Sequence, residues 1–224
     1  MAGQIVEILD VKKITHNVKS FNVKKPKNFS FVPGQAVDMS INLPSYEKEK
    51  RPFTITSLNW DKNLEFTIKI YPERKGITKR LGELKKGEKL IIYDLFGAIS
   101  YKGKGVFIAG GAGVTPFIAI LRQLRKDKEL DGNTLIFSNK TEEDIILKSE
   151  FDKMAKEGLK VIYTLTRELN PKYANRRIDE SFIKGQIKDF KHNFYVCGSI
   201  RFVGEIVHSL RKLGADDERI IVES

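Results

Sequence analysis

Hydrophobic and polar residues alternate over short stretches in the first part of the chain. Alternation with a period of two residues is typical of half-buried β-strands. Turn-forming residues such as Pro26-Lys27-Asn28 and Pro33-Gly34 separate these stretches. The pattern predicts a small antiparallel β-barrel that is interrupted by one helix over residues 77–84. Its expected strands are residues 4–11, 18–23, 36–41, 53–57, 64–71 and 89–93.

Beyond residue 103 the pattern changes to continuous apolar runs that alternate with amphipathic helical stretches. Such alternation is typical of a parallel sheet with helices on both faces, whose ligands bind at the carboxyl ends of the strands. We predict a barrel domain over residues 1–100 and an α/β domain over residues 101–224. The expected strands are 106–109, 134–138, 160–165 and 194–197, and the expected helices are 116–126, 142–157, 179–187 and 200–213.

A glycine-rich turn joins the first of these parallel strands to its helix. It reads Gly110-Gly111-Ala112-Gly113-Val114-Thr115-Pro116. Such a turn points backbone N–H groups and the positive end of a helix dipole at one place, and glycine lets a phosphate approach closely. It matches neither the ATPase phosphate loop nor the Gly-x-Gly-x-x-Gly fingerprint. Taken alone, it predicts a phosphate site and leaves an ordinary tight turn open.

The charge of the chain is strongly positive and uneven. The net charge is +11, and residues 1–102 contribute +8 of it, from 19 Lys and Arg against 11 Asp and Glu. A basic surface attracts acidic partners at long range, although solvated lysines without a partner give the same composition. The lysines are dispersed among acidic residues and form no basic tract, so we do not expect nucleic-acid binding.

Cys197 is the only cysteine in the sequence. This count excludes internal disulfides, a cysteine-ligated iron–sulfur cluster and a cysteine-rich zinc site. His16, His192 and His208 show no metal-ligand spacing, so no metal site is expected. The sequence has no apolar run of about 18 residues and no secretory pattern at its start, which predicts a cytoplasmic protein without a membrane span.

Three further motifs accompany the glycine turn. Arg51-Pro52-Phe53-Thr54 opens a barrel strand, Gly76-Ile77-Thr78 opens the barrel helix, and Tyr195-Val196-Cys197-Gly198-Ser199 ends a parallel strand. A barrel followed by an α/β domain, with these motifs in this order, resembles the ferredoxin–NADP reductase family over essentially the whole chain. The resemblance implies FAD in the barrel and NADP, or NAD, on the parallel sheet.

In the barrel, the resemblance assigns three residues of the first motif to the flavin. Arg51 would pair with its diphosphate through a rigid fork of hydrogen bonds. Phe53 would lie against the isoalloxazine ring, and the Thr54 hydroxyl would lie near flavin N5, which accepts hydride. The other expected flavin contacts are Gly76, Ile77 and Thr78 at the phosphate, where Thr78 is also a candidate N-cap, and the backbone of Ile68, Lys69 and Ile70.

In the α/β domain, the resemblance places Cys197 and Gly198 beside nicotinamide C4, where Cys197 would pack rather than react. A buried structural cysteine is the alternative. Thr166 and Arg167 would lie near the adenosine, where Arg167 can pair with a 2′-phosphate and favours NADPH. Lys172, Tyr173, Arg176 and Arg177 lie close by in the sequence. The dinucleotide diphosphate would lie on Gly110, Gly111, Gly113, Thr115 and Pro116, with Thr115 facing the nicotinamide.

The chain departs from the family pattern in three places. Asp94-Leu95-Phe96-Gly97 stands where the family often has Gly-Pro-x-Gly, and Ser199 stands where it has proline. The sequence ends at Ser224 without the aromatic that covers the flavin in many relatives, which predicts a flavin face that is open or is covered by something other than a terminal ring. Glu223 joins Thr54 and Cys197 as an expected catalytic residue, with an exposed terminal carboxylate as the alternative.

These features predict a flavoprotein oxidoreductase. Hydride would pass between NAD(P)H and FAD, and electrons would pass to or from an external carrier. The basic surface favours an acidic carrier such as ferredoxin or flavodoxin. Three alternatives stay open: an electron-transfer subunit of a larger complex, a free-standing flavin or diaphorase-type reductase, and a binding module that has lost turnover.

Overall fold

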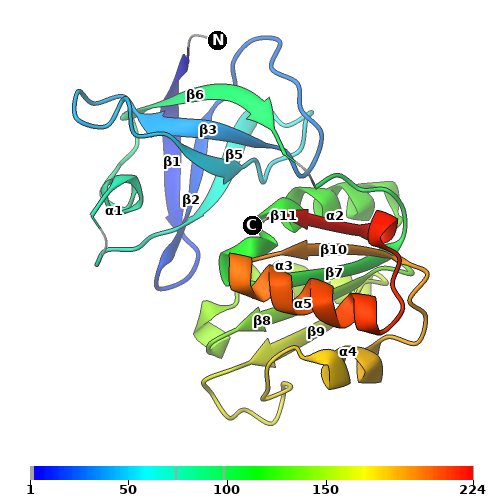
Figure 1. Cartoon of the computed structure of the whole chain (residues 1–224). Coiled ribbons are helices and arrows are strands. Elements are labelled where there is room, and N and C mark those ends of the chain that lie inside the picture. Colours follow the sequence, from blue (N-terminus) through cyan, green and yellow to red (C-terminus); the bar gives the residue numbers. More distant parts are fainter. Residues whose placement is uncertain (1–2, 74, 98, 224) are drawn as a thin grey trace.

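The first half of the chain folds into a closed antiparallel barrel. The computed structural model describes residues 3–73, 75–97 and 99–223. Six strands form one sheet in the order β4-β3-β6-β1-β2-β5 (Figure 1). A bridge between Ile55 and Phe66 closes the sheet into a barrel. The elements are β1 (Gln4–Lys13), β2 (Val18–Lys24), β3 (Ala36–Ile41), β4 (Arg51–Thr54), β5 (Asn63–Lys69), α1 (Ile77–Leu81) and β6 (Lys89–Phe96).

The second half contains a five-stranded parallel sheet in the order β11-β10-β7-β8-β9. Its strands are β7 (Gly105–Gly110), β8 (Thr134–Asn139), β9 (Lys160–Leu165), β10 (Asn193–Cys197) and β11 (Ile220–Glu223). Its helices are α2 (Thr115–Asp127), α3 (Lys148–Lys156), α4 (Glu180–Gln186) and α5 (Ile200–Lys212), with 3-10 turns at Gly111–Val114, Glu142–Asp144 and Asp217–Arg219.

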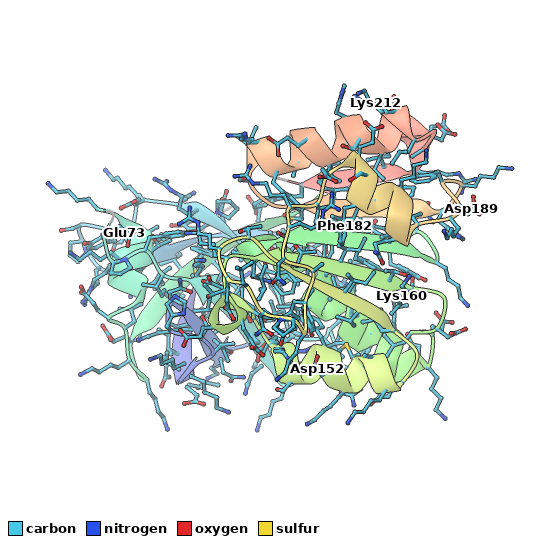
Figure 2. The ribbon with its side chains drawn as sticks, turned by 90° about the horizontal axis from the view of Figure 1, so that it is seen from below. Glu73, Asp152, Lys160, Phe182, Asp189 and Lys212 are labelled. Atoms are coloured by element: carbon cyan, nitrogen blue, oxygen red, sulfur yellow. The ribbon has the colours of Figure 1, made fainter. Side chains whose placement is uncertain are left out.

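Successive residues of the parallel strands build two cores on opposite faces of the sheet. Phe137 of β8 belongs to the core beneath α2 and α3, whereas its neighbour Ile136 belongs to the core beneath α4 and α5. Figure 2 shows Asp152 of α3 and Lys212 of α5 on opposite sides of the sheet. The predicted fold class, a barrel followed by a parallel α/β domain, is confirmed. The division at residues 100 and 101 stays a prediction.

Several predicted boundaries differ from the structure. The helix expected over 142–157 is broken, because Ile145 is extended and Leu147 adopts a left-handed φ of 52°. The helix expected over 77–84 ends at Leu81, and its N-cap is Gly76 rather than Thr78. The sequence pattern also missed β11, which is only four residues long. No helix within the described residues has the length and apolar character that crossing a bilayer requires.

A half-buried arginine joins the two domains. Arg122 of α2 donates to the Thr56 carbonyl and the Glu65 carboxylate of the barrel, at 2.8 and 2.7 Å. The same guanidinium makes a bidentate pair with Glu150 at 2.7 and 2.9 Å. Burial alone would raise the pKa of Glu65, but Arg122 lowers it below its ordinary value. At the rim of the interface, the Lys126 ammonium lies 3.5 Å from the ring centre of Trp60.

Candidate functional site

The carboxyl ends of the central parallel strands open onto a cleft between the two domains. The cleft has a volume of about 300 Å³. Lys69 reaches it from the barrel, across the domain boundary. The α/β domain contributes Gly110, Gly111, Ser138, Asn139, Lys140, Asp144, Thr166, Ser199 and Phe202. The topology therefore gathers residues far apart in sequence at the edge where ligands of parallel sheets bind.

The glycines of the turn serve two different purposes. A Cβ at Gly113 would lie 2.3 Å from the carbonyl oxygen of Cys197, so glycine allows the turn to pack against the end of β10. Gly111 has a left-handed φ of 54°, and an added Cβ there would meet no described atom within 4 Å. The open space at Gly111 is a cradle in which a ligand can approach the backbone.

Thr115 and Pro116 shape this turn from within the protein. The Thr115 hydroxyl donates to the carbonyl of Ala112 at 3.0 Å, where the 3-10 turn leads into α2. Pro116 is buried in the first turn of α2, where a missing N–H costs nothing. Both residues therefore fix the direction of the helix that begins at the cleft.

Cys197 and Glu223 lie side by side at the ends of β10 and β11. They are partners in the register of these two strands. Burial, with a smaller contribution from the Glu223 carboxylate, raises the pKa of the Cys197 thiol to about 12. A buried thiol that stays protonated is a poor nucleophile, so covalent chemistry at Cys197 is disfavoured.

A cationic pocket continues the cleft beyond Thr166. Its cations are Lys140, Arg167, Arg177 and Arg201. Arg201 is paired with Glu205 at 2.7 Å, whereas the other three form no ion pair with a carboxylate within the described residues. Three neighbouring basic groups without a carboxylate partner suit a phosphate.

The basic and aromatic residues expected near the adenosine do not all lie together in the structure. Arg177 faces the cationic pocket, but Arg176 pairs with Asp179 at 2.8 Å. The Tyr173 hydroxyl donates to the Glu142 carboxylate, which ties it to the neighbouring loop. Of these two arginines, only Arg177 lines the pocket.

The predicted flavin-phosphate site in the barrel contains a carboxylate that the sequence did not indicate. Glu49 accepts a hydrogen bond from the N–H of Ile77 at 3.1 Å, and its oxygen lies 3.5 Å from the Arg51 guanidinium. Gly76, with a φ of 125°, approaches the same carboxylate. The Ile77 N–H and the Arg51 guanidinium, which were expected to hold a phosphate, therefore contact the Glu49 carboxylate instead. Thr78 lies one residue further along the helix.

The remaining barrel residues lie on β4 and β5. Phe53 packs on the barrel core from β4, which ends at Thr54. The Ile68 side chain is buried in this core, so only its backbone is available to a ligand. Ile70, just beyond β5, is half-buried and packs against the same core. Lys69 points the other way, and its ammonium lies 3.8 Å from the Asp144 carboxylate.

Sequence reasoning missed Asn139, Lys140 and Glu49. Asn139 and Lys140 directly follow the strand expected at 134–138, so the rule for carboxyl ends of parallel strands was a usable signal. Lys69 was expected to act through its backbone, and its reach into the cleft depends on how the domains pack. Glu49 lies in a polar loop and carried no signal.

The fold and the cleft define a class of protein: a two-domain oxidoreductase with one site for a flavin and another for a nicotinamide dinucleotide. Residues 4–101 match a sequence model of an FAD-binding domain, and residues 107–208 match a model of an oxidoreductase NAD-binding domain. The chain therefore combines an FAD-binding domain with an oxidoreductase NAD-binding domain. The open cradle at Gly111 and the cationic pocket fit the dinucleotide.

Curated relatives are named as reductases. NADH-cytochrome b5 reductase 1 of Aspergillus terreus is 32% identical over 68% of this chain and 57% of its own length. Human NADH-cytochrome b5 reductase 2 is 26% identical over 95% of this chain and 91% of its own length. Nitrate reductase [NADH] of Solanum lycopersicum is 28% identical over 94% of this chain, which spans 27% of that relative.

Solved structures share the fold at low sequence identity. The flavohem-like FAD/NAD binding domain of nitric oxide dioxygenase from Vibrio cholerae has a TM-score of 0.89 at 21% identity, covering 100% of this chain and 98% of that one. A ferredoxin NADP+ reductase from Neisseria gonorrhoeae, with bound FAD and NADP, has a TM-score of 0.86 at 18% identity and the same coverage.

Proposed function

We propose that this chain takes electrons from NAD(P)H in the cleft and delivers them to a separate one-electron carrier. The observation that supports this most directly is the cleft itself, where Lys69 of the barrel faces the glycine turn of the α/β domain. Bound FAD supplies the redox chemistry by accepting hydride and releasing electrons. The protein contributes binding and orientation.

For the flavin, we propose that Arg51 and the backbone at Gly76, Ile77 and Thr78 hold the phosphates after Glu49 moves aside. Phe53 would contact the ring, and Thr54 would hold the flavin N5 edge by a hydrogen bond. The backbone of residues 68–70 would follow the ribityl chain. Exchange of the Glu49 carboxylate for a phosphate keeps the Arg51 guanidinium and the Ile77 N–H in contact with an anion.

For the dinucleotide, we propose that Gly110, Gly111 and Gly113 hold the diphosphate. Cys197 and Gly198 would position the nicotinamide, with Glu223 beside the thiol. Thr166 and Arg167 would lie at the adenosine, and Thr115 and Pro116 would fix the turn. In this arrangement the protein orients the two cofactors, and none of its side chains forms a covalent bond.

We further propose that NADPH is preferred over NADH, although the relatives are named for NADH. Lys140, Arg167 and Arg177 lie around one pocket without carboxylate partners among the described residues. The test is the ratio of kcat/KM for NADPH and NADH in Arg177→Ala, with Arg176→Ala as the control because that side chain pairs with Asp179. An unchanged ratio in Arg177→Ala would remove this preference from the proposal.

The electron carrier is proposed to be acidic, because the chain has a net charge of +11. Ferredoxin and flavodoxin are the predicted carriers, and the names of the curated relatives favour cytochrome b5 as a second candidate. Stopped-flow reduction of each carrier by the NADPH-reduced protein distinguishes them, and the rate should fall as salt is raised. If free flavin or a dye is reduced but no carrier is, a diaphorase-type reductase is favoured.

An absorbance spectrum tests the core of the proposal. Purified protein should show bound FAD that bleaches when NADPH is added without oxygen. Retained flavin without bleaching would favour a binding module that has lost turnover, whereas bleaching only with a partner chain would favour a subunit of a larger complex. The expected cytoplasmic location stays a prediction.

A further inference from the structure

Asn139 is a buried amide without a hydrogen-bond partner. The residue is 5% exposed, and neither its Oδ1 nor its Nδ2 finds a partner within the described residues. Burying an amide without compensating hydrogen bonds destabilises a fold, so most buried polar groups are paired. An unpaired amide in a native site therefore calls for a partner from outside the protein.

The position of Asn139 limits what that partner can be. The residue ends β8 and lines the cleft together with Gly110, Gly111 and Lys69. Its own carbonyl accepts from the N–H and hydroxyl of Thr166 at 3.0 and 3.2 Å, so β9 holds the backbone in place. The surroundings thus offer a cradle of backbone and two lysines, Lys69 and Lys140, which together suit an anionic group with oxygen atoms.

The one carboxylate in this wall of the cleft is already engaged. Asp144 accepts hydrogen bonds from the backbone and hydroxyl of Thr141 at 3.2 and 3.1 Å. Lys69 and His16 lie 3.8 and 3.7 Å from its other oxygen. Asp144 therefore does not pair with Asn139, and it holds the Lys69 ammonium at the edge of the cleft.

We propose that the Asn139 side chain binds the diphosphate–ribose segment of the dinucleotide, with Nδ2 donating to an oxygen of that segment. This inference rests on the proposed dinucleotide site and adds a residue to it. Both polar atoms of the amide are covered in the ligand-free protein, so the wall of the cleft would shift slightly to let an oxygen of the ligand reach Nδ2. No protein hydrogen bond to the amide has to be broken when this happens. Asn139 is then a binding residue that acts from the strand next to the glycine turn.

Thr164 provides a matched control. Its hydroxyl is equally buried, at 0% exposure, and also lacks a partner within the described residues. It does not line the cleft. Removing either polar group should stabilise the ligand-free protein or leave it unchanged, because an unsatisfied group is lost. Only the change at Asn139 should weaken ligand binding.

The experiment measures dissociation constants by calorimetry on the FAD-bound protein, together with the melting temperature. The probes are NADP+ and ADP-ribose, which lacks the nicotinamide. Asn139→Ala should weaken both by about 10-fold or more. The near-isosteric Asn139→Asp should weaken them further, because its carboxylate repels the diphosphate, and Thr164→Val should leave both constants unchanged.

Two outcomes would overturn the inference. One is an unchanged affinity in both Asn139 variants with melting temperatures close to that of the parent protein. The other is a loss confined to NADP+ with normal ADP-ribose binding, which would place the amide at the nicotinamide. Failure of the parent protein to bind NADP+ and NAD+ at all would instead count against the proposed function, so the two ideas fail in different ways.

Discussion

The two proposed cofactor sites differ in how the ligand-free protein treats their polar groups. In the barrel, the Glu49 carboxylate contacts the Ile77 N–H and the Arg51 guanidinium, the two groups proposed to hold the flavin phosphate. In the cleft, the amide of Asn139 has no partner within the described residues, and Gly111 faces open space. At the proposed sites, the flavin would therefore replace an internal anion, whereas the dinucleotide would complete hydrogen bonds that the ligand-free protein leaves unmade.

Exposure explains part of this contrast. The Arg51 side chain is 57% exposed, so water can solvate it whenever Glu49 leaves. Asn139 lies at a strand end beneath the cleft, where its amide is covered and solvent cannot compensate it. An exposed group such as the Arg51 guanidinium costs the protein little when no ligand is bound, because water can solvate it. A buried unpaired group such as the Asn139 amide lowers the stability of the ligand-free protein.

The largest effect is expected from Gly113→Ala, which would disrupt the cleft. The new methyl group would overlap the backbone of Cys197 and Gly198 at 2.3 to 2.6 Å, so the turn must move away from β10. We expect a loss of about 3 kcal/mol in unfolding free energy and loss of dinucleotide binding, measured by denaturant melts and titration.

Gly111→Ala is the matched control for that variant. Its methyl group meets no described atom within 4 Å, so only the strain of a left-handed residue remains, about 1–2 kcal/mol. Dinucleotide binding should still weaken, because the methyl group enters the cradle. Equal losses of stability in the two variants would show that Gly113 is not a packing position.

Arg122→Ala should uncouple the two sites. It leaves the half-buried carboxylates of Glu65 and Glu150 without their shared cation, at a cost of about 2–3 kcal/mol. The exposed pair between Arg125 and Glu157 is the control, and Arg125→Ala should cost less than about 1 kcal/mol. Thermal unfolding measures both. FAD should stay bound while hydride transfer slows, and an unchanged rate would argue against a role in orienting the domains.

The same ion pair predicts a pH dependence. The pKa of Glu65 is lowered in the fold, because the attraction of Arg122 outweighs the effect of burial. Its contribution to stability is therefore complete above the ordinary pKa of 4.5 and is lost as the pH falls through the lower folded value. Melting temperatures between pH 6 and 3 should fall less steeply in Arg122→Ala than in the parent protein.

Glu49→Gln tests the proposed flavin-phosphate site in the barrel. Removing the charge that competes with the flavin phosphate should tighten FAD binding by about 5- to 10-fold, or about 1 kcal/mol. Titration of the flavin-free protein with FAD measures this change. Glu47→Gln removes a charge from the same loop and should have little effect, so equal gains in both variants would point to a general effect of charge.

The smallest effect on the two proposed cofactor sites is expected at Cys197, whose prediction concerns its chemical reactivity. Its pKa of about 12, against an ordinary 9.0, leaves about 1,000-fold less thiolate near pH 8 than a free thiol has. Alkylation by iodoacetamide should therefore be very slow in the folded protein and fast in denaturant. The contribution of the neutral thiol to stability is present below pH 9 and is lost as the pH rises toward 12. Rapid alkylation of the native protein would contradict the burial of this residue.

Local patterns were sufficient to predict the parts of this protein that depend on neighbours in sequence. The strand, glycine turn and helix at 105–127 could be predicted because glycine, proline and apolar periodicity act within a few residues. The break at Leu147 could not, since helical periodicity continues across it and the break depends on tertiary packing. Lys69 and Glu49 are likewise defined by distant contacts, with Asp144 and with the start of α1.

Lys69 belongs to the barrel but contributes to the wall of a cleft in the other domain. A dinucleotide that binds there touches both halves of the chain, so its binding energy is shared between them. By thermodynamic linkage, any factor by which the dinucleotide strengthens FAD binding must equal the factor by which FAD strengthens dinucleotide binding. If Lys69 does carry such a coupling, each cofactor changes the affinity of the protein for the other by the same factor.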